Sequence, residues 1–461
     1  MDKRFPIEDQ IEMLGAALKG RVVTPADADY ETYRLVANGR FHHHPAAVIR
    51  VASATDVAAV LNFAQATDLP IAVRSGGHSV VGHSGNNGGL VIDLRDLNRI
   101  DIDAGARTAW VGTGLTAGQI TLAVEQHGLI IGFGDAPTVG VGGLTLGGGI
   151  GYLIRKHGLT IDSLLAAEVV TAAGEIVVAD ETSHPDLFWA LRGGGGNFGV
   201  VTRLKFRLHP LPEFTGGPLV LPATPEVLAG FVAAAEAAPD ELSSIVMIMP
   251  APPLPFLPPE VHGKLVIIGA MAYAGAPDAA TAALAPFRAL TTPIADLVGP
   301  APYSSLYQLA PPEDECPAVT IRSRFIDRMG IAEATTMLAA LERCDAPMKL
   351  GQVRVLGGAA ARVPAEATAF AHRKSRILVA YLAMYDDVAD AVGAYDLWAT
   401  EAMAELRQDD AGAYVNFLGD EGTGGLNAAY PAATWERLRK VKRHYDPENL
   451  FRSNQNVPPA V

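Results

Sequence analysis

Glycine is concentrated in three short segments of this chain, at 76–89, 140–151 and 193–199. Seven of the twelve residues from Gly140 to Gly151 are glycine, and no ordinary helix or strand tolerates that density. We therefore expect 136–151 to be irregular. Glycine clusters that alternate with strand-like runs predict a backbone packed closely against a ligand. The length of 461 residues allows two or three domains, and 49% hydrophobic with 19% charged residues is a globular composition.

Charge and cysteine content narrow the possible partners. A net charge of -14 disfavours nucleic acid and anionic membrane surfaces. Apolar runs such as 377–382 are too short to span a bilayer, and the acidic N-terminus lacks a secretory apolar region. We therefore expect a soluble cytoplasmic protein, either a monomer or a homodimer. Cys316 and Cys344 lack metal-ligand spacing, and the adjacent histidines at 42–44 cannot all face one ion, so no metal site is expected.

Hydrophobic periodicity divides the chain into two kinds of structure. Before Leu211-Pro212 the elements are short: strands are expected at 71–73, 89–94, 109–112, 165–172, 175–179 and 200–208, and helices at 116–127 and 184–191. Ser53 or Thr55 caps a further helix that ends at Pro70. After this point the elements are longer: helices are expected at 225–237, 278–290, 331–343 and 388–406, and strands at 264–273, 319–326, 348–356 and 377–385.

This organisation predicts an α+β fold. The first domain spans 1–211. An antiparallel sheet covered by helices forms a second domain at 212–411. The remaining residues, 412–461, are expected to return to the first domain.

The run Arg74-Ser75-Gly76-Gly77-His78-Ser79 ends a predicted strand. Its two glycines leave the turn without side chains, and successive backbone N–H groups there form a concavity suited to a diphosphate. The histidine then projects from a loop with little steric protection. A tight structural turn with a surface histidine remains an equally good interpretation of the spacing alone.

Two other glycine segments invite comparison with nucleotide sites. Thr145 and the amides of 140–151 are placed to meet phosphate oxygens, although a glycine-rich packing loop is the alternative. The run from Gly194 to Gly199 satisfies GxGxxG, but a strand follows it where a dinucleotide site requires a helix. A nicotinamide site is therefore excluded, and the chain contains no GxxxxGK[ST] phosphate loop.

Five motifs occur here in one order that resembles the berberine bridge enzyme-like flavoproteins, a branch of the vanillyl-alcohol-oxidase or PCMH-type FAD fold. They are RSGGHSVVG at 74–82, PTVGVGGLTLGGGIGYLIRKHGL at 137–159, DLFWALRGGGGNFGVVT at 186–202, YVN at 414–416 and YDPENLFRSNQN at 445–456. The resemblance implies a two-subdomain FAD-binding domain beside the antiparallel-sheet substrate domain. In length and plan the chain is similar to the bacterial 6-hydroxy-D-nicotine oxidase subgroup.

The resemblance also implies how the cofactor is held. The family histidine bonded to the 8α-methyl of FAD matches His78, and the cysteine of a second link is replaced by Ala136, so a single covalent link is expected. The residues that it implies for FAD binding are Arg74, Ser75, Gly76, Gly77, His78, Ser79, Gly82, Pro137, Thr138, Gly140, Gly142, Gly143, Thr145, Gly148, Gly149, Gly151, Asn197, Gly199, Val200, Val201, Tyr414, Asn416, Asn454 and Asn456.

The expected catalytic machinery is incomplete. Where the family often has Y-x-N-Y, this chain keeps Tyr414 but has Phe417, and a family Gln or Glu position is Ala380, next to Tyr381. Tyr414 is the first choice of base, with a structural core tyrosine as the alternative. Further pocket candidates are Gln352, Arg354 and Tyr381.

The resemblance implies hydride transfer from a carbon of a small organic substrate to flavin N5, with O2 as acceptor giving H2O2. The substrate would be a secondary alcohol, a cyclic amine or a natural-product intermediate. Two alternatives stay open: a flavin-dependent cyclase or dehydrogenase with another acceptor, and a non-catalytic binding protein on the same fold.

Overall fold

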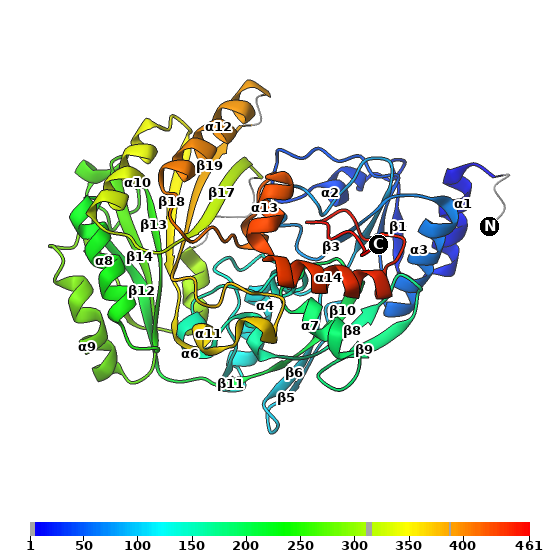
Figure 1. Cartoon of the computed structure of the whole chain (residues 1–461), viewed down its shortest axis with the longest axis horizontal. Coiled ribbons are helices and arrows are strands. Elements are labelled where there is room, and N and C mark those ends of the chain that lie inside the picture. Colours follow the sequence, from blue (N-terminus) through cyan, green and yellow to red (C-terminus); the bar gives the residue numbers. More distant parts are fainter. Residues whose placement is uncertain (1–4, 310–315, 387–388) are drawn as a thin grey trace.

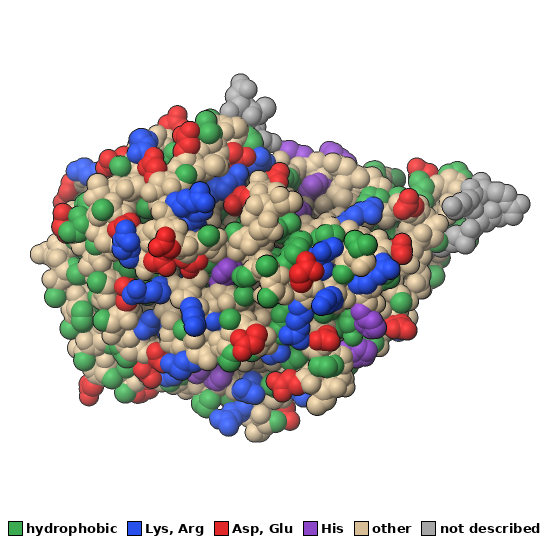
Figure 2. Space-filling model, in the orientation of Figure 1, with side chains coloured by type: hydrophobic (Ala, Val, Ile, Leu, Met, Phe, Trp, Pro, Cys, Tyr) green, Lys and Arg blue, Asp and Glu red, His purple; other side chains and the backbone are tan. Residues whose placement is uncertain are grey.

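The computed structural model describes residues 5–309, 316–386 and 389–461. A large sheet with helices on its outer side forms one end of the molecule (Figure 1). Two smaller sheets and the C-terminal helices form the other end. None of the helices in these ranges is long and apolar enough to cross a membrane. The face in Figure 2 intersperses basic with acidic side chains.

The first small sheet has four strands in the order β1-β2-β4-β3, with β4 parallel to both β2 and β3. Its elements are α1 (Ile7–Ala17), β1 (Arg21–Val23), α2 (Tyr30–Arg34), β2 (Ala47–Arg50), α3 (Ala54–Thr67), β3 (Ile71–Arg74) and β4 (Leu90–Asp93). Ser53 caps α3, because its hydroxyl accepts from the Asp56 N–H at 3.2 Å. The Asp56 carboxylate instead accepts the N–H groups of Lys19, Gly20 and Ala52, which ties α3 to the loop before β1.

The second small sheet is antiparallel, in the order β5-β6-β10-β8-β9. Its strands are β5 (Ile100–Asp103), β6 (Thr108–Gly112), β8 (Leu164–Val170), β9 (Ile176–Ala179) and β10 (Val200–Arg207). The helices around it are α4 (Ala117–Glu125), α5 (Val141–Leu146), α6 (Ile154–His157) and α7 (Pro185–Leu191), and a short pair joins β7 (Leu129–Ile130) to β11 (His209–Pro210).

The expectation that 136–151 forms no helix is wrong, because α5 lies within it. This helix has only six residues. Gly142 is accommodated because a neighbouring loop packs directly on the helix backbone there: a Cβ on Gly142 would lie 3.2 Å from Ser75 Oγ.

The large sheet has the strand order β15-β12-β14-β13-β18-β19-β17, and β16 also pairs with β12. Its strands are β12 (Phe214–Pro222), β13 (Leu242–Pro250), β14 (Leu265–Ala274), β15 (Ala295–Asp296), β16 (Gly299–Pro300), β17 (Ala318–Ile326), β18 (Met348–Val355) and β19 (Ile377–Tyr385). Its outer face is covered by α8 (Pro225–Ala237), α9 (Pro277–Arg288), α10 (Ile331–Arg343) and α12 (Ala389–Glu405), as Figure 1 shows. Side chains of this face and of the helices form one hydrophobic core. The remaining face is free to build a cavity wall.

The C-terminal residues lie against the two small sheets (Figure 1). Their elements are a single turn at Val415–Phe417, α13 (Gly422–Ala429) and α14 (Ala432–Tyr445). Lys442 is fully buried, forms an ion pair of 2.7 Å with Asp446, and donates to the carbonyls of Asn197 at 2.9 Å and Phe451 at 2.8 Å. These contacts tie α14 to the glycine segment that precedes β10.

Candidate active site

A cavity of about 1290 Å³ lies where the two small sheets, the inner face of the large sheet and the C-terminal segment meet. Sites for drug-sized ligands occupy roughly 300–1,000 Å³, so this one has room for a dinucleotide and a substrate. The wall is built from the loop after β3, the 134–144 segment, the 195–201 segment, four strands of the large sheet, and residues 414–418 and 451–455.

The loop after β3 is anchored by Arg74. Its buried guanidinium donates to the carbonyls of Ser84 at 3.1 Å and of Tyr33. Burial lowers the pKa of Arg74 to about 10, so it stays charged at neutral pH. Gly76 permits the close approach of the two glycine segments, because a Cβ there would lie 2.2 Å from the Gly140 nitrogen.

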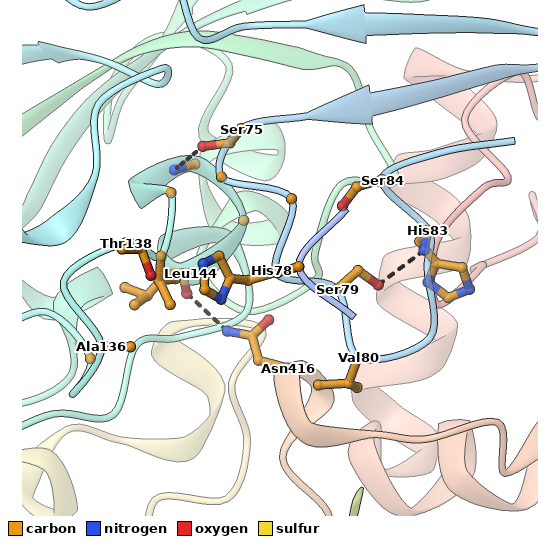
Figure 3. Close-up of a pocket in the computed structure, with 18 of the residues that line it drawn as sticks. Ser75, His78, Ser79, Val80, His83, Ser84, Ala136, Thr138, Leu144 and Asn416 are labelled. Atoms are coloured by element: carbon orange, nitrogen blue, oxygen red, sulfur yellow. Dashed lines mark hydrogen bonds between the residues drawn. The ribbon is translucent and has the colours of Figure 1, made fainter. Parts of the chain in front are cut away.

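Ser75 joins the same two segments (Figure 3). Its hydroxyl donates to the Thr113 carbonyl at 2.5 Å and accepts the Gly142 N–H at 3.3 Å. The loop is thus held in place from the inside, and its backbone lines the cavity.

His78 extends from this loop toward Thr138 and Leu144 (Figure 3). Within the described ranges its ring makes no hydrogen bond. Burial lowers the pKa of His78, so the imidazole is neutral at physiological pH. A neutral imidazole keeps a lone pair on one ring nitrogen, which is what a nucleophile requires.

Tyr414 and Asn416 connect the C-terminal segment to the glycine segment. The Tyr414 hydroxyl accepts the Gly149 N–H at 3.0 Å and the Asn416 side-chain N–H at 2.9 Å. Asn416 also donates to the Leu144 carbonyl at 3.0 Å. Burial raises the pKa of Tyr414, so the phenol is protonated at neutral pH.

The inner face of the large sheet supplies the rest of the wall, with every second residue of each strand facing inward. These residues are Ile245, Met247, Val319, Ile321, Leu350, Gln352, Arg354, Leu382 and Met384. Most of them are apolar. Gln352 and Arg354 are the polar exceptions on the described wall of this sheet.

Tyr381 does not belong to the site, and that prediction is wrong. It alternates with Leu382 along β19 and therefore faces the outer side of the sheet. Its side chain is fully buried in the core under the helices, with its ring 5.6 Å from the ring of Trp398.

Asp135, which was not among the residues expected in the site, lies on the cavity wall directly before Ala136. The Arg354 guanidinium donates to the Asp135 carboxylate at 2.7 Å, to the side-chain oxygen Oε1 of Gln352 at 2.9 Å and 3.1 Å, and to the backbone carbonyl of Ile150 at 3.0 Å. It also lies 4.9 Å from the centre of the Phe417 ring. No local pattern marks Asp135, because its partner is 219 residues away.

The other predicted cofactor residues fall into two groups. Those on the cavity wall are Arg74, Ser75, Gly76, Gly77, His78, Ser79, Pro137, Thr138, Gly140, Gly142, Gly143, Asn197, Gly199, Val201, Tyr414, Asn416 and Asn454. Those away from it are Gly82, Thr145, Gly148, Gly149, Gly151, Val200 and Asn456.

Residues of the second group do not line the cavity, and their part in FAD binding stays a prediction. A Cβ on Gly149 would lie 2.1 Å from the Thr160 hydroxyl, and one on Gly151 would lie 1.4 Å from the Phe133 carbonyl. Thr145 is fully buried, and its hydroxyl has no partner within the described ranges. These glycines allow close packing between backbone segments.

Cys316 also lines the cavity and is a free exposed thiol. In the described part of the chain no group of three or more His, Cys, Asp or Glu side chains is arranged to hold a metal ion.

The residues present fit FAD. Backbone N–H groups of two glycine-rich loops suit a diphosphate, and the long cavity leaves space beyond it. The Asn454 side-chain oxygen is buried beside the cavity without a partner in the described ranges, so it is free for a ligand donor.

Comparisons with known proteins agree with this geometry. An FAD binding domain family model matches residues 45–180, and a berberine and berberine-like model matches 413–458. (R)-6-hydroxynicotine oxidase of Paenarthrobacter nicotinovorans is 31% identical over 96% of this chain and 97% of its own. An FAD-linked oxidoreductase of Bacillus subtilis, YgaK, is also 31% identical over 96% of this chain and 97% of its own.

Solved structures show the same architecture. The crystal structure of 6-hydroxy-D-nicotine oxidase from Arthrobacter nicotinovorans superposes with a TM-score of 0.87 and 27% identity, over 96% of this chain and 98% of that one. Berberine bridge enzyme from Eschscholzia californica shares the fold, with a TM-score of 0.83 and 22% identity over 98% of this chain and 99% of that one.

Fold and site together define an FAD-binding oxidoreductase of the PCMH type. The chain belongs to the berberine bridge enzyme-like family of FAD-linked oxidases, enzymes that oxidise small organic molecules.

Proposed function

We propose that this enzyme holds FAD through a single covalent bond to His78 and oxidises a secondary alcohol, a cyclic amine or a natural-product intermediate. The observation that carries the attachment is the His78 ring, which is neutral, without a hydrogen-bond partner in the described ranges, and directed into the cavity. Ala136 offers only a methyl group at the position of the second link. A relative named for 6-hydroxynicotine oxidation supports a small organic substrate.

Bound FAD supplies the two-electron oxidant, and O2 is the proposed acceptor, giving H2O2. The apolar inner face of the large sheet excludes water from the reacting carbon. Tyr414 is held by two donors and carries its own proton at neutral pH, so its remaining role is to donate a hydrogen bond toward the cavity. Gln352 is the second proposed polar contact to substrate. A cytoplasmic location, as monomer or homodimer, is part of the same proposal.

Acid precipitation tests the attachment. Yellow flavin is expected in the washed pellet of the wild type and to be lost from the pellet of His78→Ala. Cys316→Ala is the matched control, because Cys316 is a potential nucleophile on the same cavity wall. Its pellet should stay yellow. Flavin lost from Cys316→Ala, or freely released from the wild type, contradicts the single link to His78.

A second function is favoured by Ala380 and Phe417, which stand where the family often has polar residues. With fewer proton-transfer groups, the enzyme would act as a flavin-dependent cyclase or as a dehydrogenase with another acceptor. Measuring H2O2 during turnover separates the two. One H2O2 per substrate oxidised supports the oxidase, and product without H2O2 supports the alternative.

A further inference from the structure

We infer that Asp135 is the residue that selects the substrate: it accepts a hydrogen bond from a protonated amine or a hydroxyl on an otherwise apolar molecule. The inference rests on the proposed function, because it assigns a recognition role within the same cavity. It starts from the cluster formed by Asp135, Gln352 and Arg354.

The donors of Arg354 are almost all engaged. A guanidinium has five N–H groups, and four hydrogen bonds run from this one to Asp135, Gln352 and the Ile150 carbonyl. Its side chain is only 4% exposed. Arg354 therefore organises the cluster and has little capacity to bind an anionic ligand itself.

All three members of the cluster line the cavity, and Asp135 is the most exposed of them. Its side chain is 28% exposed, and its bonds to Arg354 and Gln352 both go to Oδ2. The second oxygen, Oδ1, has no hydrogen-bond partner within the described ranges. The Arg354 guanidinium forms an ion pair of 2.7 Å with this carboxylate. Oδ1 of Asp135 is therefore a hydrogen-bond acceptor on the exposed, negative side of this ion pair.

The surroundings define the rest of the ligand. Inward-facing side chains of the large sheet next to the cluster are aliphatic or thioether groups, such as Met247, Leu350 and Leu382. Such a wall favours an apolar body, while Oδ1 requires a donor. A ligand carboxylate would meet a like charge, which is strongly unfavourable. The predicted order of preference is therefore ammonium, then hydroxyl, then carboxylate.

Three probes that share one ring test this order: benzylammonium, benzyl alcohol and benzoate. Each is titrated into the FAD-loaded enzyme without O2, with binding followed by calorimetry and by the flavin absorption spectrum. In the wild type, benzylammonium should bind at least tenfold more tightly than benzoate. In Asp135→Asn that preference should reverse, because Arg354 loses its carboxylate partner and becomes a net cation beside the cavity.

Asp162→Asn is the matched control. Asp162 is also bonded to a buried arginine, Arg373, at 2.8 Å, but neither residue lines the cavity. Its order of preference should stay that of the wild type. A double variant, Asp135→Asn with Arg354→Met, removes both charges and should bind the charged probes with similar affinity.

Tighter binding of benzoate than benzylammonium to the wild type overturns the inference, as does failure of benzylammonium to bind or an unchanged order in Asp135→Asn. The covalent link is scored separately by acid precipitation of the same samples. Free flavin with a reversed preference contradicts the attachment alone. Attached flavin with an unchanged preference contradicts the role of Asp135 alone.

Discussion

Gln352 and Ala380 lie directly opposite each other in β18 and β19, so their side chains share the cavity face of the large sheet. The family resemblance assigns a Gln or Glu to position 380. In this chain the amide stands one strand away, where its oxygen accepts two N–H groups of Arg354, at 2.9 Å and 3.1 Å. This part of the cavity face therefore carries a polar side chain, but on β18 and not on β19.

Moving the amide from position 352 to position 380 should restore part of the stability that is lost when Gln352 is replaced by alanine. Gln352→Ala leaves two buried donors of Arg354 without an acceptor, which should lower the free energy of unfolding by about 1–3 kcal/mol. The exchange variant, Gln352→Ala with Ala380→Gln, returns an amide about 4.8 Å away and conserves volume. Urea midpoints should place the exchange variant between the wild type and Gln352→Ala. An exchange variant with a lower urea midpoint than Gln352→Ala would contradict the idea that an amide at position 380 can replace the one at position 352.

Removing the Tyr414 hydroxyl should affect both stability and the site. Tyr414→Phe leaves the Gly149 N–H and one Asn416 N–H without their acceptor, at a cost of about 1–3 kcal/mol, and should shift the flavin spectrum and slow substrate-dependent flavin reduction. Tyr430→Phe is the control: its buried hydroxyl donates to the Gly193 carbonyl at 3.2 Å, away from the cavity. It should lose stability with spectrum and reduction rate unchanged. The same flavin spectrum and reduction rate in both variants would contradict a role for Tyr414 in the site.

Adding one methyl group at Gly76 should separate the two glycine loops. A Cβ there would overlap the Gly140 nitrogen, so Gly76→Ala should cost at least about 1–3 kcal/mol and reduce the FAD content, read as the ratio of flavin to protein absorbance. Gly424→Ala, in α13, meets no atom within 4 Å and should match or slightly exceed the wild-type stability. Normal flavin content in Gly76→Ala would show that the loops need not touch.

Acid should destabilise the fold through histidines that are buried without charge. Burial lowers the pKa of His83 and of His209 to about 4, from an unfolded value of about 6.5. Between these values the unfolded chain binds more protons, so stability falls as pH drops from about 6.5 to about 4. Urea midpoints across this range should fall less steeply for His209→Gln than for the wild type. His127→Gln, at an exposed position, should follow the wild type. Parallel curves for all three would contradict the prediction.

Features of the fold that depend on a local sequence pattern could be predicted. The strand that ends at Arg74 and the two following glycines identify the loop that presents His78, and alternation in β10 identifies a half-buried strand. The strand expected after the GxGxxG run is confirmed as β10.

Features that depend on neighbours distant in the sequence could not be predicted. The apolar run of β19 is buried on both faces, so alternation could not tell which face Tyr381 takes. Four strands of the large sheet, β12, β13, β15 and β16, were not expected. Of these, β12 contains Gly216, Gly217 and Pro218, which weaken any strand pattern. The helix α5 depends on packing against other loops, which no local propensity reveals.

The return of the C-terminal segment sets an order on biosynthesis. Asn416 and Asn454 line the cavity wall. Asn197 is synthesised much earlier, but its side-chain oxygen accepts the N–H of Val457 at 2.9 Å, so this bond forms only after residue 457 has been added. Until Asn416, Asn454 and Val457 have been synthesised, the cavity lacks part of its wall. We therefore expect a chain that ends before Val457 to bind FAD less well than the full chain, which would make flavin loading a late step of maturation.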